Sequence, residues 1–141
     1  MATRLTGGCL CGSVRYVLQG PLRPVVACHC KMCRRLTGHF FAGTQVHTEN
    51  LLSEEDESLT WYQSSAEVRR GFCSRCGSTL FFQRSGTGRT TVAAGTLDEP
   101  TGLRLVQHIF ARHAGDYYTI DDALPKYDEH GEMPGLEGEQ T

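Results

Sequence analysis

The sequence predicts a single, mainly β domain whose short strands are braced by bound metal. Three observations support this prediction: short apolar segments are separated by glycine, no long amphipathic helix is visible, and seven cysteines stand in three tight clusters. A chain of 141 residues suits one domain with a modest core. Its hydrophobic content of 39% is low enough that bound metal would help it to fold. We place this domain at residues 1–127.

The expected strands follow one another with glycine and proline between them. In the first, residues 13–18, the side chains of Val14, Tyr16 and Leu18 share one face. Residues 51–58 are polar and acidic and are expected to form a loop. Residues 121–124 are expected to form a short helical turn that Pro125 ends. The other expected strands are residues 25–27, 40–46, 59–62, 68–72, 79–83, 90–94, 105–110 and 117–120.

The formal charge of −2 is unevenly distributed along the chain. Residues 128–141 carry five acidic side chains and no Lys or Arg, and we expect them to form a flexible acidic tail. Residues 1–127 carry 14 Lys and Arg against 11 acidic side chains, about +3, an excess that favours a small anionic ligand and is too weak for nucleic acid. The first ten residues lack a secretory apolar stretch, and no segment has the length of a membrane span. We therefore expect a cytoplasmic protein with reduced thiols.

Two cysteine pairs predict one closed zinc site. Cys73 and Cys76, followed by Gly77, form a zinc-knuckle pattern in which two thiolates converge across a tight turn. A knuckle needs a second pair of ligands. Cys9 and Cys11 suit this role, because residues two apart in an extended segment point to the same face. Buried free cysteines are the alternative, and the spacing favours metal.

The third cluster, Cys28, Cys30 and Cys33, places three thiolates within six residues. Three thiolates can hold one Zn²⁺ and leave its fourth position to water or substrate. A neutral ligand such as His29 or His39 would instead close the site and make it structural. Redox sensing by an exposed cysteine of low pKa is a further alternative, which leaves the other four cysteines unexplained.

Basic residues stand beside both cysteine groups. Zn²⁺ with three thiolates carries a net charge of −1, so nearby cations would stabilise the site; Lys31, Arg34 and Arg35 are the local candidates. Arg69, Arg70 and Arg75 flank the knuckle and can bind carboxylates, although such side chains are more often solvated.

Together these residues resemble the glutathione-dependent formaldehyde-activating (GFA) family, which includes centromere protein V-like domains. The likeness covers about residues 7–127, with all three cysteine clusters in the same order and spacing. The matching motifs are Gly8-Cys9-Leu10-Cys11-Gly12, Cys28-His29-Cys30-x-x-Cys33-Arg34, Phe72-Cys73-x-x-Cys76-Gly77, Ala94-Gly95-Thr96-Leu97-Asp98, His108-Ile109 and Ile120-Asp121-Asp122-Ala123-Leu124-Pro125-Lys126-Tyr127.

The resemblance implies a zinc-stabilised, tent-like stack of short antiparallel sheets with few short helical turns. It implies a carbon–sulfur lyase activity, in which formaldehyde and glutathione condense to S-hydroxymethylglutathione. Charge and proximity in the sequence suggest Arg34 and Arg35 as groups that bind the carboxylates of glutathione. The implied ligands are Cys9, Cys11, Cys73 and Cys76 for a structural zinc and Cys28, Cys30 and Cys33 for a catalytic zinc.

Three functions follow as hypotheses. The first is a zinc-dependent lyase acting on an adduct of a thiol, such as glutathione, with a small aldehyde. The second is a non-catalytic, zinc-braced binding module, which would need a closed second site. The third is a nucleic-acid-binding zinc ribbon, which the missing basic and aromatic stripe disfavours. We predict the first, without a nucleic-acid or membrane partner, and the sequence assigns no oligomeric state.

Overall fold

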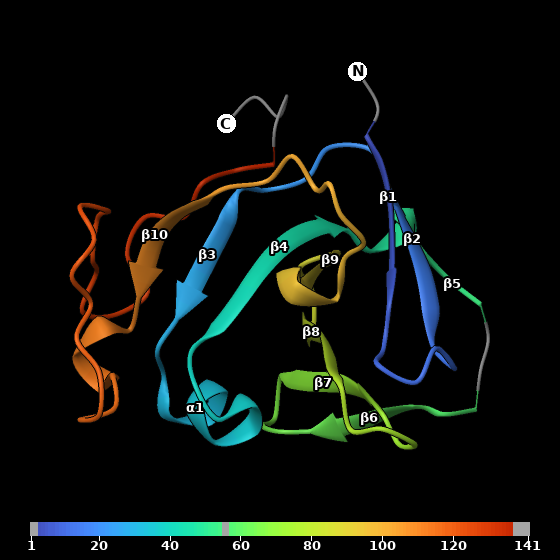
Figure 1. The fold of residues 1–141 in the computed structure, drawn as a ribbon, viewed down its shortest axis with the longest axis horizontal. Coiled ribbons are helices and arrows are strands. Elements are labelled where there is room, and N and C mark those ends of the chain that lie inside the picture. Colours follow the sequence, from blue (N-terminus) through green and yellow to red (C-terminus); the bar gives the residue numbers. More distant parts are fainter. Residues whose placement is uncertain (1–2, 55–56, 137–141) are drawn as a thin grey trace.

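The chain folds into two β-sheets that enclose a common core (Figure 1). A computed structural model describes residues 3–54 and 57–136. The mainly β prediction is confirmed over these ranges. The strands are β1 Arg4–Gly8, β2 Arg15–Gln19, β3 Val25–Cys28, β4 Phe41–His47, β5 Leu51–Ser53, β6 Leu59–Gln63, β7 Val68–Cys73, β8 Thr79–Arg84, β9 Arg89–Ala93 and β10 Leu105–Ile109; the helix is α1 Lys31–Thr37, and 3-10 turns lie at Thr48–Asn50, Ala94–Thr96 and Ala111–His113.

The smaller sheet has three antiparallel strands in the order β1-β2-β5. The larger sheet has seven strands in the order β10-β3-β4-β9-β8-β7-β6. All neighbours in it are antiparallel except β10 and β3, which run parallel, so the sheet is mixed where the sequence predicted antiparallel pairing. Most of the domain lies between β3 and β10 in the chain, and this provides the long crossover that parallel strands require.

The core lies between the two sheets. Tyr16 and Leu18 on β2, which the alternating pattern placed on one face, are both buried. The Tyr16 ring meets the Phe81 ring of the larger sheet edge to face, with ring centroids 5.2 Å apart. Trp61 stacks on Phe81 at 6.0 Å. Phe81 therefore joins the two sheets from the middle of the core.

Four local predictions differ from the structure. Strands β1 and β5 were not predicted, and residues 117–120 form no strand. Residues 121–124 form a bend where a helical turn was expected, because the Asp122 carboxylate accepts the Leu124 N–H at 3.1 Å and so competes with helical bonding. Helix α1, Lys31–Thr37, has only seven residues, with Cys30 as its N-cap and Gly38 as its C-cap. No helix in the described ranges is long and apolar enough to cross a membrane.

The described part of the acidic segment, residues 128–136, lies against β10. The Phe110 N–H donates to the Glu129 carbonyl at 2.8 Å, and Leu136 is buried with 2% exposure. The remainder of the predicted tail, residues 137–141, lies outside the described residues. Hydrogen bonds along the edge strand thus hold a segment that has few apolar residues of its own.

We predict that Phe81→Ala lowers the free energy of unfolding by about 3–5 kcal/mol, because it opens a cavity where the sheets meet. Tyr62→Ala on strand β6 of the same sheet is the matched control, since Tyr62 is 58% exposed, and it should change stability by less than about 0.5 kcal/mol. Urea denaturation measures both. Equal losses in the two variants would contradict a core centred on Phe81.

Candidate metal centres and their cavity

Four sulfur atoms from distant parts of the chain meet at one place. The Sγ atoms of Cys9, Cys11, Cys73 and Cys76 all lie within 4.8 Å of one another. Cys9 and Cys11 are 3.6 Å apart, and Cys11 and Cys73 are 3.8 Å apart. A tetrahedral zinc site with Zn–S bonds of 2.3 Å has sulfur–sulfur edges of roughly 3.8 Å. The group therefore has the donor set and the spacing of a closed tetrahedral site.

Local backbone geometry builds this group from two turns. Cys73 ends β7, and Gly77 takes the positive φ of 80° that the knuckle pattern predicted. Its N–H donates to the Cys73 carbonyl at 2.7 Å. The other pair follows β1, where the Val14 N–H donates to Cys9 Sγ at 3.2 Å. These bonds aim the sulfurs inward before any ion binds.

Two serines beside the four sulfurs were missed in the sequence. The Ser13 hydroxyl lies 3.4 Å from Cys73 Sγ and lowers the pKa of that thiol to about 7. The Ser78 hydroxyl lies 3.2 Å from Cys76 Sγ and lowers the pKa of that thiol to about 5. Both hydroxyls stabilise the thiolate form, which is the form that binds metal. Their positions within two residues of a cysteine are the only sequence signal for this role.

Cys28, Cys30 and Cys33 form the second group, with all three sulfurs within 4.8 Å of one another. Cys28 ends β3, and Cys30 caps α1 by accepting the Cys33 N–H at 3.3 Å. Hydrogen bonds from Cys28 and then Cys33 lower the pKa of the Cys30 thiol, and the charge of Arg70 acts in the same direction. Within the described residues, no histidine, aspartate or glutamate joins this group.

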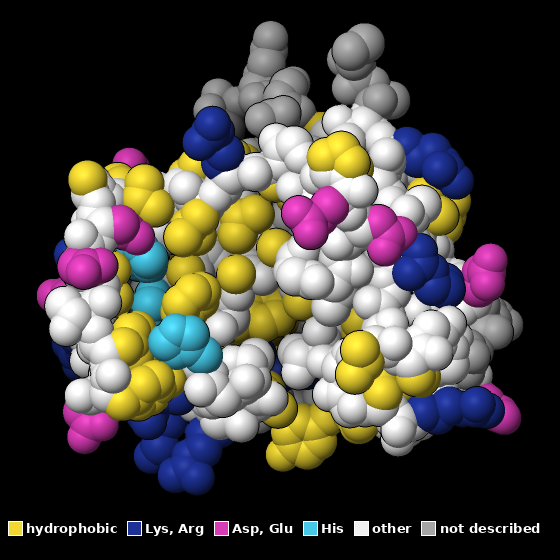
Figure 2. Space-filling model, in the orientation of Figure 1, with side chains coloured by type: hydrophobic (Ala, Val, Ile, Leu, Met, Phe, Trp, Pro, Cys, Tyr) yellow, Lys and Arg dark blue, Asp and Glu magenta, His cyan; other side chains and the backbone are white. Residues whose placement is uncertain are grey.

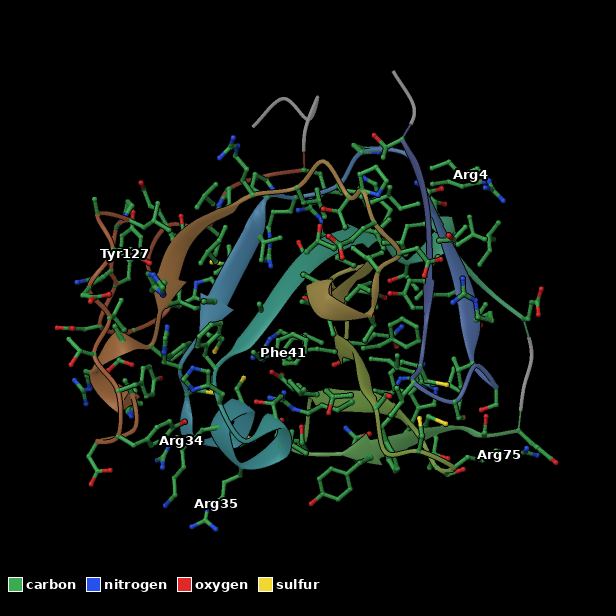
Figure 3. All side chains as sticks on the ribbon, viewed as in Figure 1. Arg4, Arg34, Arg35, Phe41, Arg75 and Tyr127 are labelled. Carbon is green, nitrogen blue, oxygen red and sulfur yellow. The ribbon has the colours of Figure 1, made fainter. Side chains whose placement is uncertain are left out.

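The three cysteines line a cavity of about 840 Å³. Its floor is one face of the larger sheet, because Cys28 pairs with Phe41 across β3 and β4, and Phe82 pairs with both Thr91 and Arg70. Figure 2 shows a hollow near the centre of this face with hydrophobic side chains around it, and Phe41 lies at the same place in Figure 3. The cysteine group therefore faces a space large enough for a small-molecule ligand.

The cation beside the three cysteines is Arg70, which is 37 residues from Cys33 in sequence. Its guanidinium donates to Cys33 Sγ at 3.8 Å and to the Ser64 hydroxyl at 3.3 Å, and its side chain is buried. The cations expected from the local sequence do not line this cavity. Arg34 and Arg35 are not among the residues that line the cavity, and Figure 3 shows Arg35 directed away from the molecule.

His29 stands between two of the cysteines and uses both ring nitrogens away from them. Its Nδ1 lies 2.5 Å from the Tyr118 hydroxyl, and its Nε2 lies 2.9 Å from His108 Nδ1. His108 Nε2 lies 2.8 Å from Asp122 Oδ2. His39, the other histidine considered as a ligand, contacts the Tyr117 hydroxyl at 3.0 Å. The structure thus places neither histidine with the three sulfurs.

Asp122 stands at one end of this hydrogen-bonded network and Tyr118 at the other, and their chemistry decides which atoms donate. The hydrogen bond to His108 lowers the pKa of Asp122, so its carboxylate accepts and His108 Nε2–H donates. With neutral imidazoles, His108 Nδ1 then accepts from His29 Nε2–H, and His29 Nδ1 accepts from the Tyr118 hydroxyl. Each buried polar atom in the chain has one partner. This hydrogen-bonded network therefore fixes the turn that carries Cys28 and Cys30.

We predict that Tyr118→Phe lowers the free energy of unfolding by about 1–3 kcal/mol, because it leaves the buried Nδ1 of His29 without a donor. Tyr117→Phe is the matched control, since Tyr117 is exposed, and it should be neutral. Denaturation measures stability, and competition with a zinc chelator measures metal retention. Faster zinc loss is expected from the three-cysteine group only. Identical behaviour of the two variants would contradict a supporting role for the chain.

Burial, followed by the nearby His108 and His39, lowers the pKa of His29 from its ordinary 6.5 to about 4. Between these values the unfolded chain binds a proton that the folded chain does not. The contribution of His29 to the free energy of unfolding should therefore be fully present above pH 6.5. It should be lost progressively as the pH is lowered towards 4. NMR titration of the His29 ring measures this directly, with urea-unfolded protein as the reference. A folded-state midpoint near 6.5 would disprove it.

Known proteins of two organisms are similar to part of this chain. An uncharacterised lyase of Schizosaccharomyces pombe is 32% identical over 78 residues, which cover 54% of this chain and 55% of that protein. The match thus spans about half the length of that curated relative. The crystal structure of a Rhodobacter sphaeroides protein shares the fold, with 24% identity and a TM-score of 0.54 over 67% of this chain and 88% of that one.

A family model covers most of the domain. The model described as glutathione-dependent formaldehyde-activating enzyme matches residues 4–113, a range that includes all seven cysteines of the two groups. This match extends over well more than half of the chain, and the fold and both cysteine groups are consistent with it. The chain belongs to the glutathione-dependent formaldehyde-activating enzyme family.

Proposed function

We propose that this protein is a zinc-dependent carbon–sulfur lyase that acts on the adduct of a thiol with a small aldehyde. The observation that carries the proposal is the position of the three-cysteine group, which lines a cavity and includes no fourth protein ligand among the described residues. A closed structural site has four protein ligands, whereas a catalytic zinc site has three and an exchangeable position. Family membership and the lyase name of the relative support the same reaction class.

The two cysteine groups have separate roles in this proposal. Cys9, Cys11, Cys73 and Cys76 would hold a structural zinc, because their four sulfurs complete a tetrahedron. Zn²⁺ held by Cys28, Cys30 and Cys33 would supply a Lewis acid that favours the thiolate form of a substrate thiol or polarises a carbonyl oxygen. Arg70, which donates to Cys33 Sγ, offsets part of the negative charge of three thiolates.

The reaction is balanced without any further reactant. The thiol sulfur bonds to the carbonyl carbon, the carbon–oxygen π bond breaks, and the thiol proton ends on the new hydroxyl oxygen. The reverse reaction breaks the carbon–sulfur bond and releases both substrates. The sheet face that holds Phe41 and Phe82 excludes water from one side of the cavity and positions the substrates beside the sulfurs.

The charge of the cavity supports an anionic thiol such as glutathione. Of the described residues that line it, four are arginines and none is Asp or Glu. Burial, together with the charge of Arg89, lowers the pKa of Arg23 to about 10, so Arg23 remains charged at neutral pH. Arg84 and Arg89 enter from the adjoining strands β8 and β9. Arg84 is already paired with the Glu67 carboxylate at 3.2 Å. A substrate carboxylate placed near Arg23 and Arg89 would relieve the repulsion between those two guanidinium groups.

Two further expectations remain proposals. Arg34 and Arg35 would bind substrate only from outside the cavity, so we propose the cavity arginines for the main carboxylate contacts. The free cysteines suit a reducing, cytoplasmic compartment. The alternative function, a zinc-braced binding module, requires a closed second site, and the cavity position of the three cysteines argues against it.

The test is the rate of glutathione–formaldehyde adduct exchange, measured by NMR for zinc-loaded wild type, for Cys33→Ser and for buffer. The uncatalysed reaction proceeds by itself, so only acceleration above buffer counts. Wild type should accelerate exchange, and Cys33→Ser should return it to the buffer rate while metal analysis still finds zinc at the four-cysteine group. No acceleration by fully zinc-loaded protein would reject this substrate and favour the binding module.

A further inference from the structure

The segment after the family-matched region forms one wall of the three-cysteine cavity. The family model ends at residue 113. Residues His130, Met133, Pro134 and Gly135 nevertheless line the same cavity as the cysteines. This segment is therefore part of the site in this chain, although the residues that define the family do not include it.

Specific contacts hold this wall in place. Gln107 on β10 is buried, and its side-chain amide donates to the Glu132 carbonyl at 2.7 Å and contacts Met133 Sδ at 3.7 Å. Gly131 takes a φ of 66°, and a Cβ at this position would collide with the Tyr127 ring. The turn thus requires glycine, and the following residues are directed onto the cavity.

The strand order places the three-cysteine group between two different environments. Cys28 on β3 pairs with Ile109 on the edge strand β10, which also carries the C-terminal segment. Ile109, Phe110, Met133 and Pro134 make this side of the cavity apolar. The strands β9, β8 and β7, which carry Arg89, Arg84 and Arg70, lie beyond β4 on the other side of β3. A ligand centred at the cysteines would meet cations on one side and apolar side chains on the other.

We propose that the C-terminal wall selects aldehydes that carry an apolar substituent, so that this chain prefers a carbonyl substrate larger than formaldehyde. The inference rests on the proposed function and deepens it. The thiol component supplies the anionic end, which the arginine side of the cavity suits. Formaldehyde has no substituent that would contact Met133 or Pro134, whereas an alkyl chain on the carbonyl carbon would be buried against them.

The experiment uses S-alkyl glutathiones, in which a methyl, propyl or pentyl group replaces the carbon skeleton of the bound aldehyde and no exchange can occur. Calorimetry measures their dissociation constants on zinc-loaded wild type, Met133→Ala and Gln107→Leu. Met133→Ala removes an apolar side chain from the C-terminal wall. Gln107→Leu removes the side-chain amide that donates to the Glu132 carbonyl and contacts Met133 Sδ. Leu52→Ala on β5 is the matched control, because Leu52 is exposed and lies outside the cavity.

In wild type and in Leu52→Ala, affinity should rise with each added methylene, by up to about fourfold, the factor that corresponds to 0.8 kcal/mol per buried CH₂. Both wall variants should flatten this dependence, with the largest loss of affinity for the pentyl compound and the smallest for the methyl compound. Equal affinity for all three compounds in wild type would overturn the inference and leave the thiol-adduct function standing. Absence of binding by every compound would also overturn it, and the formaldehyde exchange rate then decides separately whether the proposed function fails.

Discussion

The convergence of four sulfurs from two sheets is the constraint on which the rest of this structure depends. Cys9 and Cys11 follow β1 of the small sheet, whereas Cys73 and Cys76 belong to the β7–β8 turn of the large one. Four thiolates this close repel one another unless a cation lies among them. Ion binding would therefore tie the sheets together beside Phe81, where a domain with 39% hydrophobic residues has little other reserve of stability.

The extended segment from Cys28 to Cys30 places its sulfur atoms on one face and the His29 ring, which supports the turn, on the other. In an extended chain, alternate side chains point to opposite faces. The sulfurs of Cys28 and Cys30 therefore face the cavity, while the His29 ring lies on the reverse side and bonds to Tyr118 and His108. The reverse face can then hold the cysteine turn rigid without occupying the space that a substrate needs.

The cavity itself is assembled from elements that have different roles. The inner strands supply a stiff floor, α1 supplies Cys33, and the edge strand β10 holds the C-terminal segment as a wall. An edge strand has unpaired backbone groups on one side, and here the segment beyond residue 126 uses some of them. Such a wall can change in sequence without disturbing the metal groups, which would allow relatives with the same cysteines to differ in the substrate that they accept.

The sequence by itself determined the local features of this protein. Cysteine spacing predicted the two cysteine pairs and the three-cysteine group, because a tight turn or an extended segment can bring ligands two or three residues apart to one ion. The family resemblance implied that the two pairs share one site, and the tertiary structure brings them together. Alternation predicted β2, and short apolar segments between glycine and proline predicted the other seven strands apart from β1 and β5. Strand β1, with Gly7 and Gly8, and the three-residue β5 carry too weak a pattern. Only the tertiary structure decided contacts between distant residues. Arg70 reaches Cys33 because the fold brings β7 close to α1, and Gln107 holds residues 132–133 because β10 is an edge strand. Neither contact leaves a periodic or spacing signal, because each depends on how separate strands pack in space.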